Sequence, residues 1–363
     1  MNHLAIVRVL SGIALGFSVL FAICFGVALM AAEQAEMVVF AATGATVGGV
    51  GATILLLTDK PTRRAHAKDG LAVAILFWAL GGSIGAIPFV AYLSGVDFLA
   101  ALYESVSNLT TTGHSRGDSL VQPLSASMLV WRALLHMVGA VASIVIAATV
   151  FSGLNLGGPG VHRNRFFSEP EVSFFDPMLH VIRLCGVLVI GAIIVLTGLL
   201  LSIGLAPRDA LAGAVSAVTT GMVDPAAYTV APSAGAFHTL ILWGGLVLGT
   251  LGLVAIDGAG QGRLRSVPFD PETLSWIGTL LLITALAFLA GLPLLESVGW
   301  ATSSIATSGM ALSDPQQFSR LPIVLLLFPV LIGGSALSAA GGFKLARLIV
   351  LSKRVALEFV QLG

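Results

Sequence analysis

Charged residues are scarce in this chain. Only 10% of its 363 residues are Asp, Glu, Lys or Arg, whereas 56% are hydrophobic, and the mean hydropathy is +0.98. A soluble domain carries about a quarter charged residues, so this composition excludes one. The formal net charge is zero, which offers no basic surface for nucleic acid. We therefore predict a polytopic, all-α membrane protein in contact with a lipid bilayer.

Cysteine and catalytic motifs are also scarce. The two cysteines, Cys24 and Cys185, lie inside apolar runs, and no Cys/His pair has metal-ligand spacing. We interpret both as core side chains rather than as a disulfide or metal site. No acid pair, H-E-x-x-H, P-loop or G-x-S-x-G nucleophile elbow occurs in a suitable context. These absences argue against an enzyme, and we expect no covalent chemistry and no organic cofactor.

Long apolar runs fill most of the chain. They predict about eight transmembrane helices, at residues 6–30, 38–58, 71–93, 124–151, 178–203, 237–256, 274–291 and 321–351. The first has an apolar core longer than the usual 7 to about 15 residues of a signal peptide, so we interpret it as a retained helix. The glycines between Gly44 and Gly51 indicate close helix packing rather than a nucleotide loop.

Basic residues gather on one side of these spans. The loop at 59–70 is basic, and later loops on the same side are basic as well; the residues concerned are Lys60, Arg63, Arg64, Lys68, His162, Arg163, Arg165, Arg263, Arg265, Lys353 and Arg354. Short basic loops are cytoplasmic, so we expect both termini inside the cytoplasmic (inner) membrane. Arg116, Arg132, Arg208 and Arg320 then fall outside.

The stretch from Asp97 to Gly113 is too short and too polar to span a bilayer. With Asp97 as N-cap, a helix to Asn108 is ~18 Å long, about half of a ~30 Å hydrocarbon core. Leu109-Thr110-Thr111-Thr112-Gly113 follows, and β-branched residues favour an extended backbone. Extended chain at this depth can turn carbonyl oxygens toward a cation in place of its hydration shell. We predict a half-membrane helix followed by an extended ion filter.

The same pattern occurs three times. Aligned on glycine, N-L-T-T-T-G at 108–113 is matched by S-A-V-T-T-G at 216–221 and S-I-A-T-S-G at 304–309. An acid follows each copy, at Asp118, Asp224 and Asp314; it concentrates cations at the outer mouth or is simply a solvated loop charge. We predict two leading helices at 1–69 and three helix–pore-loop–helix repeats, at 70–165, 166–265 and 266–363, around a pseudo-symmetric pore axis.

Three ordered segments carry a family resemblance. They are L-F-W-A-L-G-G-S-I-G-A-I-P-F at 76–89, Y-E-S-V-S-N-L-T-T-T-G at 103–113 and W-R-A-L-L-H-M-V-G at 131–139. In this order they resemble the Trk/Ktr/HKT superfamily of potassium transporters, most closely its bacterial Trk-type membrane subunit. The resemblance implies potassium uptake through a filter in which each repeat gives one quadrant of K⁺-coordinating carbonyls.

By matching position, the resemblance assigns the filter residues. The three quadrants are Thr110, Thr111, Thr112 and Gly113; Val218, Thr219, Thr220 and Gly221; and Ala306, Thr307, Ser308 and Gly309. Val218 and Ala306 replace the family's usual Thr or Ser at the innermost position. This substitution keeps the carbonyl and removes a hydroxyl, so K⁺ over Na⁺ selectivity is less determined than the position of the pore.

The last span contains I-G-G-S-A-L-S-A-A-G-G-F-K-L-A-R at 332–347, similar to a family stretch that forms an intramembrane gating loop beneath the filter. The matching residues are Ser338, Gly341, Gly342, Lys344 and Arg347. Ala339 and Ala340 replace Thr and Gly, which predicts a straighter, less mobile gate. The alternative is that the small residues serve helix contact while Lys344 and Arg347 extend to the inner surface.

The family has four repeats, whereas these 363 residues hold three. Three explanations are open: a fragment, a chain that pairs with a second polypeptide, or a degenerate paralogue. For conduction we expect another polypeptide to supply the fourth quadrant, and an open groove between the first and third repeats of the isolated chain. The resemblance also implies a homodimer bound to a soluble nucleotide-binding regulatory subunit, for which the basic inner loops offer docking charges. The alternative function is a non-conducting or incomplete three-repeat paralogue, acting as a membrane scaffold or as one part of a split transporter.

Overall fold

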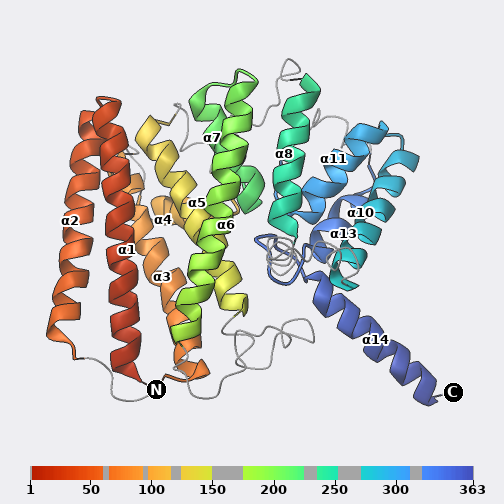
Figure 1. Cartoon of the computed structure of the whole chain (residues 1–363), viewed down its shortest axis with the longest axis horizontal. Coiled ribbons are helices and arrows are strands. Elements are labelled where there is room, and N and C mark those ends of the chain that lie inside the picture. Colours follow the sequence, from red (N-terminus) through yellow and green to blue (C-terminus); the bar gives the residue numbers. More distant parts are fainter. Residues whose placement is uncertain are drawn as a thin grey trace. The chain divides into compact units, whose positions relative to one another are not determined.

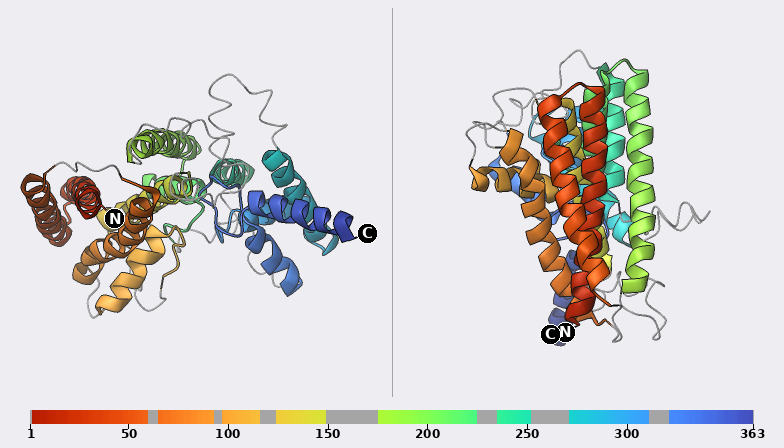
Figure 2. Two further views of the ribbon diagram at one scale, coloured as in Figure 1. Left: turned by 90° about the horizontal axis from the view of Figure 1, so that it is seen from below. Right: turned by 90° about the vertical axis from the view of Figure 1, so that its left-hand side faces the viewer.

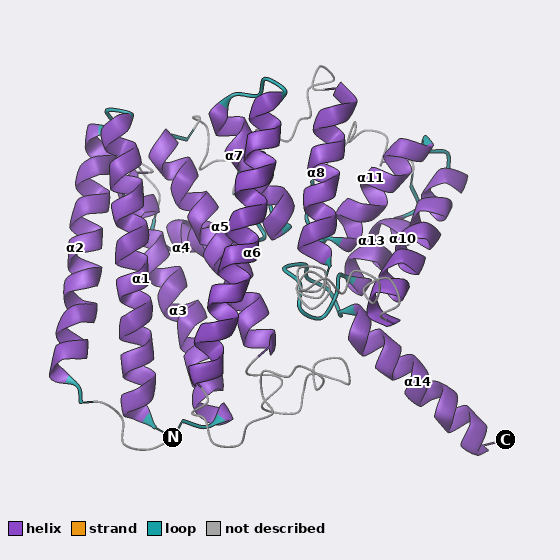
Figure 3. Cartoon of the chain, in the orientation of Figure 1, coloured by secondary structure: helices purple, strands orange, loops and turns teal. Residues whose placement is uncertain are grey.

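The structure is a computed structural model that describes residues 2–59, 65–92, 97–115, 124–148, 175–224, 235–251, 271–310 and 321–362. These residues form helices joined by loops and turns, without a strand (Figures 1 and 3). The helices are α1 (His3–Met30), α2 (Gln34–Leu57), α3 (Ala67–Tyr92), α4 (Phe98–Leu109), α5 (Ala126–Ile146), α6 (Phe175–Ser202), α7 (Pro207–Thr219), α8 (Gly235–Thr250), α10 (Pro271–Leu289), α11 (Leu294–Ile305), α13 (Ile323–Ile332) and α14 (Leu345–Leu362). The prediction of an all-α polytopic protein is confirmed.

Among the residues that the structure describes, six helices are long and apolar enough to cross a membrane: α1, α2, α3, α5, α6 and α10. The other two predicted spans contain the shorter apolar segments Phe237–Thr250 of α8 and Ile323–Ile332, which is α13. Several predicted charges lie outside the described residues: Asp118, Asp314, Arg116, Arg320, Lys60, Arg63, Arg64, His162, Arg163, Arg165, Arg263 and Arg265.

The chain divides into two compact units, and the first holds the leading helices and the first repeat. Helices α1 and α2 lie side by side (Figure 2) and pack closely. A Cβ on Gly51 would lie 3.0 Å from the carbonyl oxygen of Ser11, and one on Gly44 would lie 3.1 Å from Cβ of Phe21. Small residues are therefore needed where the two helices touch, which supports the packing role predicted for these glycines.

Helix α5 joins the leading helices to the first repeat. Trp131 of α5 is fully buried and stacks on Phe21 of α1, with ring centroids 4.5 Å apart. At the start of α5 the carboxylate of Glu33 accepts hydrogen bonds from the backbone N–H groups of Ala126 and Ser127, at 2.6 and 3.1 Å. A carboxylate at a helix N-terminus satisfies unpaired donors and complements the helix dipole.

The second unit holds α7, α8, α10, α11, α13 and α14, with most of α6. Helix α11 packs against α8, α10 and α13, and α7 packs against α8. The hydrophobic core of this second unit contains Trp276 and Ile283 of α10 and Trp300 and Ile305 of α11. In both units each of the short helices α4, α7 and α11 (hereafter the pore helices) thus packs against the helix that follows it in the same repeat.

The predicted span at 321–351 is interrupted by a loop, in line with the gating loop that the family resemblance implied. Helix α13 ends at Ile332, an irregular loop runs from Gly333 to Lys344, and α14 begins at Leu345. Gly333 has φ 72° and Gly342 has φ 80°, and a Cβ on Gly333 would lie 2.0 Å from the carbonyl oxygen of Gly341. The two ends of the loop cross where only glycine fits. The straighter course predicted from Ala339 and Ala340 is therefore wrong.

Candidate ion-filter site

Three short helices precede the predicted filter segments. Helices α4, α7 and α11 have 12, 13 and 12 residues, so at ~1.5 Å per residue each is roughly 18 to 20 Å long. Asp97 caps α4 as predicted, with its Oδ1 accepting from the backbone N–H of Ala100 at 2.9 Å. Each helix has the length for half of a ~30 Å hydrocarbon core.

All three helices end in the same left-handed turn. The residues with positive φ are Thr111 (58°), Thr220 (55°) and Thr307 (55°). The next residue in each copy donates its backbone N–H to the carbonyl of a serine five positions earlier: Thr112 to Ser107 at 2.9 Å, Gly221 to Ser216 at 3.0 Å and Ser308 to Ser303 at 3.1 Å. This is the Schellman arrangement that closes a helix C-terminus. The first filter residues therefore form a turn, not the extended chain that we predicted from their β-branched side chains.

The turn changes the register of the second copy. With Ser107, Ser216 and Ser303 aligned, Gly221 takes the place of Thr112 and Ser308. Met222 then takes the place of Gly113 and Gly309. Alignment on glycine therefore matches Gly113 with Gly221, whereas the turn matches Gly113 with Met222, one residue later. The sequence could have given the correct register, because a serine lies five residues before the end of each turn. The prediction instead aligned the copies on their glycines.

Two further glycines, which were not among the predicted filter residues, allow the returning helices α5 and α8 to touch the pore helices. A Cβ on Gly139 of α5 would lie 1.7 Å from the carbonyl oxygen of Leu109. A Cβ on Gly249 of α8 would lie 2.5 Å from that of Val218. Leu109 and Val218 both come two residues after the aligned serine, so the contact is the same in both repeats. Each returning helix thereby fixes the C-terminal end of its pore helix.

A buried polar cluster lies behind the first turn. Arg132 of α5 donates from Nε to Oδ1 of Asn108 at 3.0 Å and from Nη2 to the carbonyl of Gly113 at 3.3 Å. Its Nη1 lies 3.9 Å from Oε2 of Glu104, and Nε2 of His136 lies 3.1 Å from Oδ1 of Asn108. These four side-chain residues are at most 1% exposed. The sequence placed Arg132 among the outer charges; it is instead buried inside the first repeat.

The carbonyls of the first segment fall into two groups. The carbonyl of Gly113 accepts from Arg132, and that of His114 accepts from Oγ of Ser107 at 2.7 Å. Within the described residues, the carbonyls of Thr110, Thr111 and Thr112 accept no hydrogen bond. In the third segment Ser303 binds the carbonyl of Met310 in the same way, at 2.6 Å. The serine thus fixes the chain leaving the turn, while the threonine carbonyls remain available to a ligand.

The loop at 333–344 (hereafter the α13–α14 loop) contacts the third turn directly. The backbone N–H of Gly341 donates to Oγ1 of Thr307 at 2.7 Å. On the neighbouring helix α8, the carbonyls of Thr250 and Gly249 accept from the N–H groups of Ser335 and Ala339, at 3.1 and 3.2 Å. Of the residues assigned to gating, Gly341 and Gly342 thus lie in this loop, one against Thr307 and the other at the crossing with Gly333.

Lys344 ends the α13–α14 loop with φ 71°. Its Nζ donates to the carbonyls of Ser338 and Ala340, the former at 3.2 Å. Lys344 therefore points back into the loop, unlike the alternative interpretation in which its side chain extends away from it. Arg347 lies exposed in the first turn of α14.

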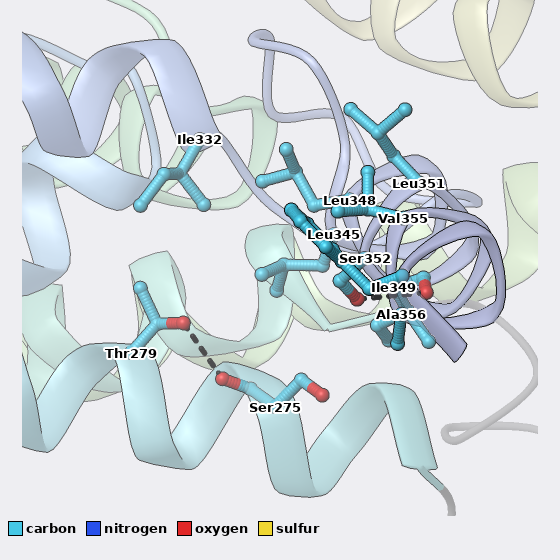
Figure 4. Close-up of a pocket in the computed structure, with 11 residues that line it drawn as sticks. Ser275, Thr279, Ile332, Leu345, Leu348, Ile349, Leu351, Ser352, Val355 and Ala356 are labelled. Atoms are coloured by element: carbon cyan, nitrogen blue, oxygen red, sulfur yellow. Dashed lines mark hydrogen bonds between the residues drawn. The ribbon is translucent and has the colours of Figure 1, made fainter. Parts of the chain in front are cut away.

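The second unit also has an open pocket of about 690 Å³ between α10, α13 and α14 (Figure 4). The residues that line it are uncharged, and Thr279 donates its hydroxyl to the carbonyl of Ser275 at 2.8 Å. A cation requires oxygen ligands directed at it. The hydroxyls of Thr279 and Ser352 in the lining donate to carbonyls of their own helices, and most of the remaining lining is aliphatic, so this pocket is not a candidate ion site.

Comparisons with known proteins agree with the motif resemblance. No family model matches the chain. The Trk system potassium uptake protein TrkH of Halomonas elongata is 26% identical over 98% of this chain and 76% of its own length. TrkG of Escherichia coli is 25% identical over 86% of this chain and 67% of its length. An uncharacterized cation transporter of Methanocaldococcus jannaschii is 24% identical over 80% of this chain and 60% of its length.

Among solved structures, the potassium transporter TrkH from Vibrio parahaemolyticus matches all of this chain and 77% of its own, with a TM-score of 0.81 and 24% identity. This likeness shows the fold. The chain spans between about three fifths and three quarters of the relatives' length. The similarity to the Trk-type superfamily that the pore motifs indicated is confirmed, and these relatives are named as transporters rather than enzymes.

Proposed function

We propose that this chain takes part in potassium uptake across the cytoplasmic membrane, as the membrane subunit of a Trk-type system. The observation that carries the proposal is the threefold occurrence of one site geometry: a half-length helix, a left-handed turn anchored on a serine, and a short segment after it. An ordinary helix bundle has no need of such a unit three times. The relatives' names point to K⁺ as the ion.

The chemistry of the proposed activity is coordination without covalent change. K⁺ loses its hydration shell to backbone carbonyls that follow the C-terminal end of a pore helix, where the helix dipole contributes partial negative charge. Unpaired carbonyls at this depth are stable only where they meet water, protein or an ion. The carbonyls of Thr110, Thr111 and Thr112 satisfy this description in the first segment.

Further parts of the proposal rest on the sequence. They are the inner-membrane location, cytoplasmic termini, a homodimer and a soluble nucleotide-binding subunit at the basic inner face. The exposed Lys353 and Arg354 of α14 contribute to that basic face. Electrostatic docking of an acidic partner there would weaken as salt rises, because exposed charges are screened beyond about 10 Å at 0.1 M salt.

The function is tested by expressing the 363-residue chain together with a second polypeptide that carries a fourth repeat, in a bacterium that lacks its own K⁺ uptake systems. The chain expressed alone, which lacks the fourth quadrant, is expected not to conduct. From the pair we expect growth at limiting K⁺ and Rb⁺ uptake above that of cells with an empty vector. Immunodetection in the membrane fraction serves as the control for expression. A pair that is present in the membrane at a normal level and gives neither growth nor uptake would contradict the proposal and favour the scaffold role.

A further inference from the structure

The buried cluster of Glu104, Asn108, Arg132 and His136 occurs in the first repeat and has an apolar counterpart in the second. Counting from the aligned serines and from the equivalent glycines Gly139 and Gly249, these four positions correspond to Gly213, Ala217, Leu242 and Leu246. The counterpart positions also face one another, since a Cβ on Gly213 would lie 3.3 Å from Cδ2 of Leu242.

The two repeats nevertheless reach the same turn. Thr111 and Thr220 have φ 58° and 55°, and the closing hydrogen bonds are 2.9 and 3.0 Å long. The second repeat therefore shows that an apolar set suffices for this fold. Burying an ion pair costs several kcal/mol of desolvation per ion, and apolar residues of similar volume are often as stable. The charged cluster thus has a role that the turn itself does not require.

The charged cluster adds a hydrogen bond to one backbone carbonyl, that of Gly113. Arg132 places a guanidinium nitrogen 3.3 Å from the carbonyl oxygen of Gly113, and Glu104 lies on the other side of the same guanidinium. A K⁺ ion on that oxygen would be repelled by the guanidinium at short range in a low-dielectric interior. Gly113 is buried, whereas Gly309 of the third segment is exposed. The Gly113 carbonyl is therefore directed to the protein, not to the ion.

We infer that Arg132 is a positioning residue for ion discrimination: by holding the Gly113 carbonyl, it restricts the first segment's ion ligands to the carbonyls of Thr110, Thr111 and Thr112. Asn108 orients the guanidinium through Nε, and Glu104 balances its charge. A fixed guanidinium fork holds two acceptors at once in a way that a lysine ammonium does not. This inference rests on the proposed potassium uptake, and it assigns the first repeat a rigid filter geometry.

The test compares the ratio of Rb⁺ to Na⁺ uptake in three forms of the full chain, each expressed with the same polypeptide that supplies the fourth repeat. The first replaces the cluster by side chains like those of the second repeat: Glu104→Ala, Asn108→Ala, Arg132→Leu and His136→Leu together, which leaves no buried charge unpaired. The second is Arg132→Lys, which keeps a positive charge near Glu104 but cannot hydrogen-bond Asn108 and the Gly113 carbonyl at the same time, as the planar guanidinium does. The third is the control Arg8→Lys, which alters an arginine that binds the carbonyl of Leu55 at 3.2 Å between the leading helices.

We expect the uptake ratio to fall about tenfold in the fourfold variant, the equivalent of one charge-assisted hydrogen bond, and to fall in Arg132→Lys as well. The control Arg8→Lys should keep the wild-type ratio. An unchanged ratio in Arg132→Lys, at wild-type membrane levels, would overturn the inference while leaving potassium uptake intact. Absence of Rb⁺ uptake by the wild-type chain expressed in the same way would instead overturn the proposed function, and this inference with it.

Discussion

At the scale of single residues, the backbone angles separate the glycines from the threonines in the pore segments. Thr111 and Thr307 adopt positive φ although they are β-branched, because the Schellman hydrogen bond holds them there. Such residues cost of order 1 to 3 kcal/mol of local strain, which the surrounding packing offsets. Gly113 and Gly309 follow with φ of 71° and 67°. In each of these segments two residues of three have left-handed backbone angles. A side chain in place of the glycine would therefore add to the backbone strain.

We predict that Gly113→Ser weakens discrimination between K⁺ and Na⁺. A side chain at φ 71° strains the backbone, and the buried position leaves little room for it. The backbone at residue 113 must therefore shift, which moves the neighbouring threonine carbonyls. The measurement is the ratio of Rb⁺ to Na⁺ uptake in cells, which should fall several-fold. Gly113→Asn is the matched control, because Asn tolerates the left-handed region better than Ser. Equal effects of Ser and Asn would contradict this conformational explanation.

A second prediction concerns Thr307, whose hydroxyl oxygen accepts the N–H of Gly341 from the α13–α14 loop. Thr307→Val keeps the shape and removes the acceptor, which leaves a backbone N–H without its partner and should loosen the loop. We expect faster labelling by a thiol reagent at a cysteine placed at Ser338. Thr307→Ser retains the hydroxyl and should label at the starting rate; equal labelling in the Val and Ser variants would show that this hydrogen bond does not hold the loop.

At the scale of elements, the pore helices α4 and α7 each depend on a glycine in the helix that returns beside them. Gly139→Ala would place a methyl carbon 1.7 Å from the Leu109 carbonyl oxygen, so α5 and α4 must move apart. We expect a loss of about 2 kcal/mol or more of stability, seen as a lower midpoint of thermal unfolding in detergent. Gly16→Ala in α1 has no heavy atom within 4 Å and should leave the midpoint unchanged or raise it slightly. Similar midpoints for both variants would contradict the close approach.

The elements differ in how far the sequence predicted them. Long apolar runs and the Asp97 cap are local signals, so the spans and α4 were predicted within a few residues. The break after Ile332 was implied only by the family resemblance, because it depends on the crossing of Gly333 with Gly341, a contact between residues on opposite sides of the loop. Burial of Arg132 was missed for a similar reason: its partners Glu104 and Asn108 lie on another helix.

At the scale of the whole molecule, the charge on α14 bears on membrane orientation. This helix begins at Leu345 after the interrupted span, and it is not among the helices apolar enough to cross a membrane. Its Arg347, Lys353 and Arg354 are exposed. Basic residues beside the end of a span are retained in the cytoplasm, so α14 is expected at the inner face. The same rule applied to the basic loop at 59–70 places the end of α2 on the same side.

We therefore predict that Gly363 and the loop at 59–70 share one side of the membrane, and that the loop at 116–123 lies on the other. Alkaline phosphatase fused after residue 118 should be active, because it folds only outside the cytoplasm. Fusions after residue 62 or after Gly363 should be inactive, and green fluorescent protein at the same two positions should fluoresce. Because the positive-inside rule acts on short loops, replacing the basic residues of 59–70 by glutamine should reduce this asymmetry. Phosphatase activity at Gly363 in the unaltered chain would mean that the segment from α13 to α14 crosses the membrane differently, and that its basic residues face the outer side.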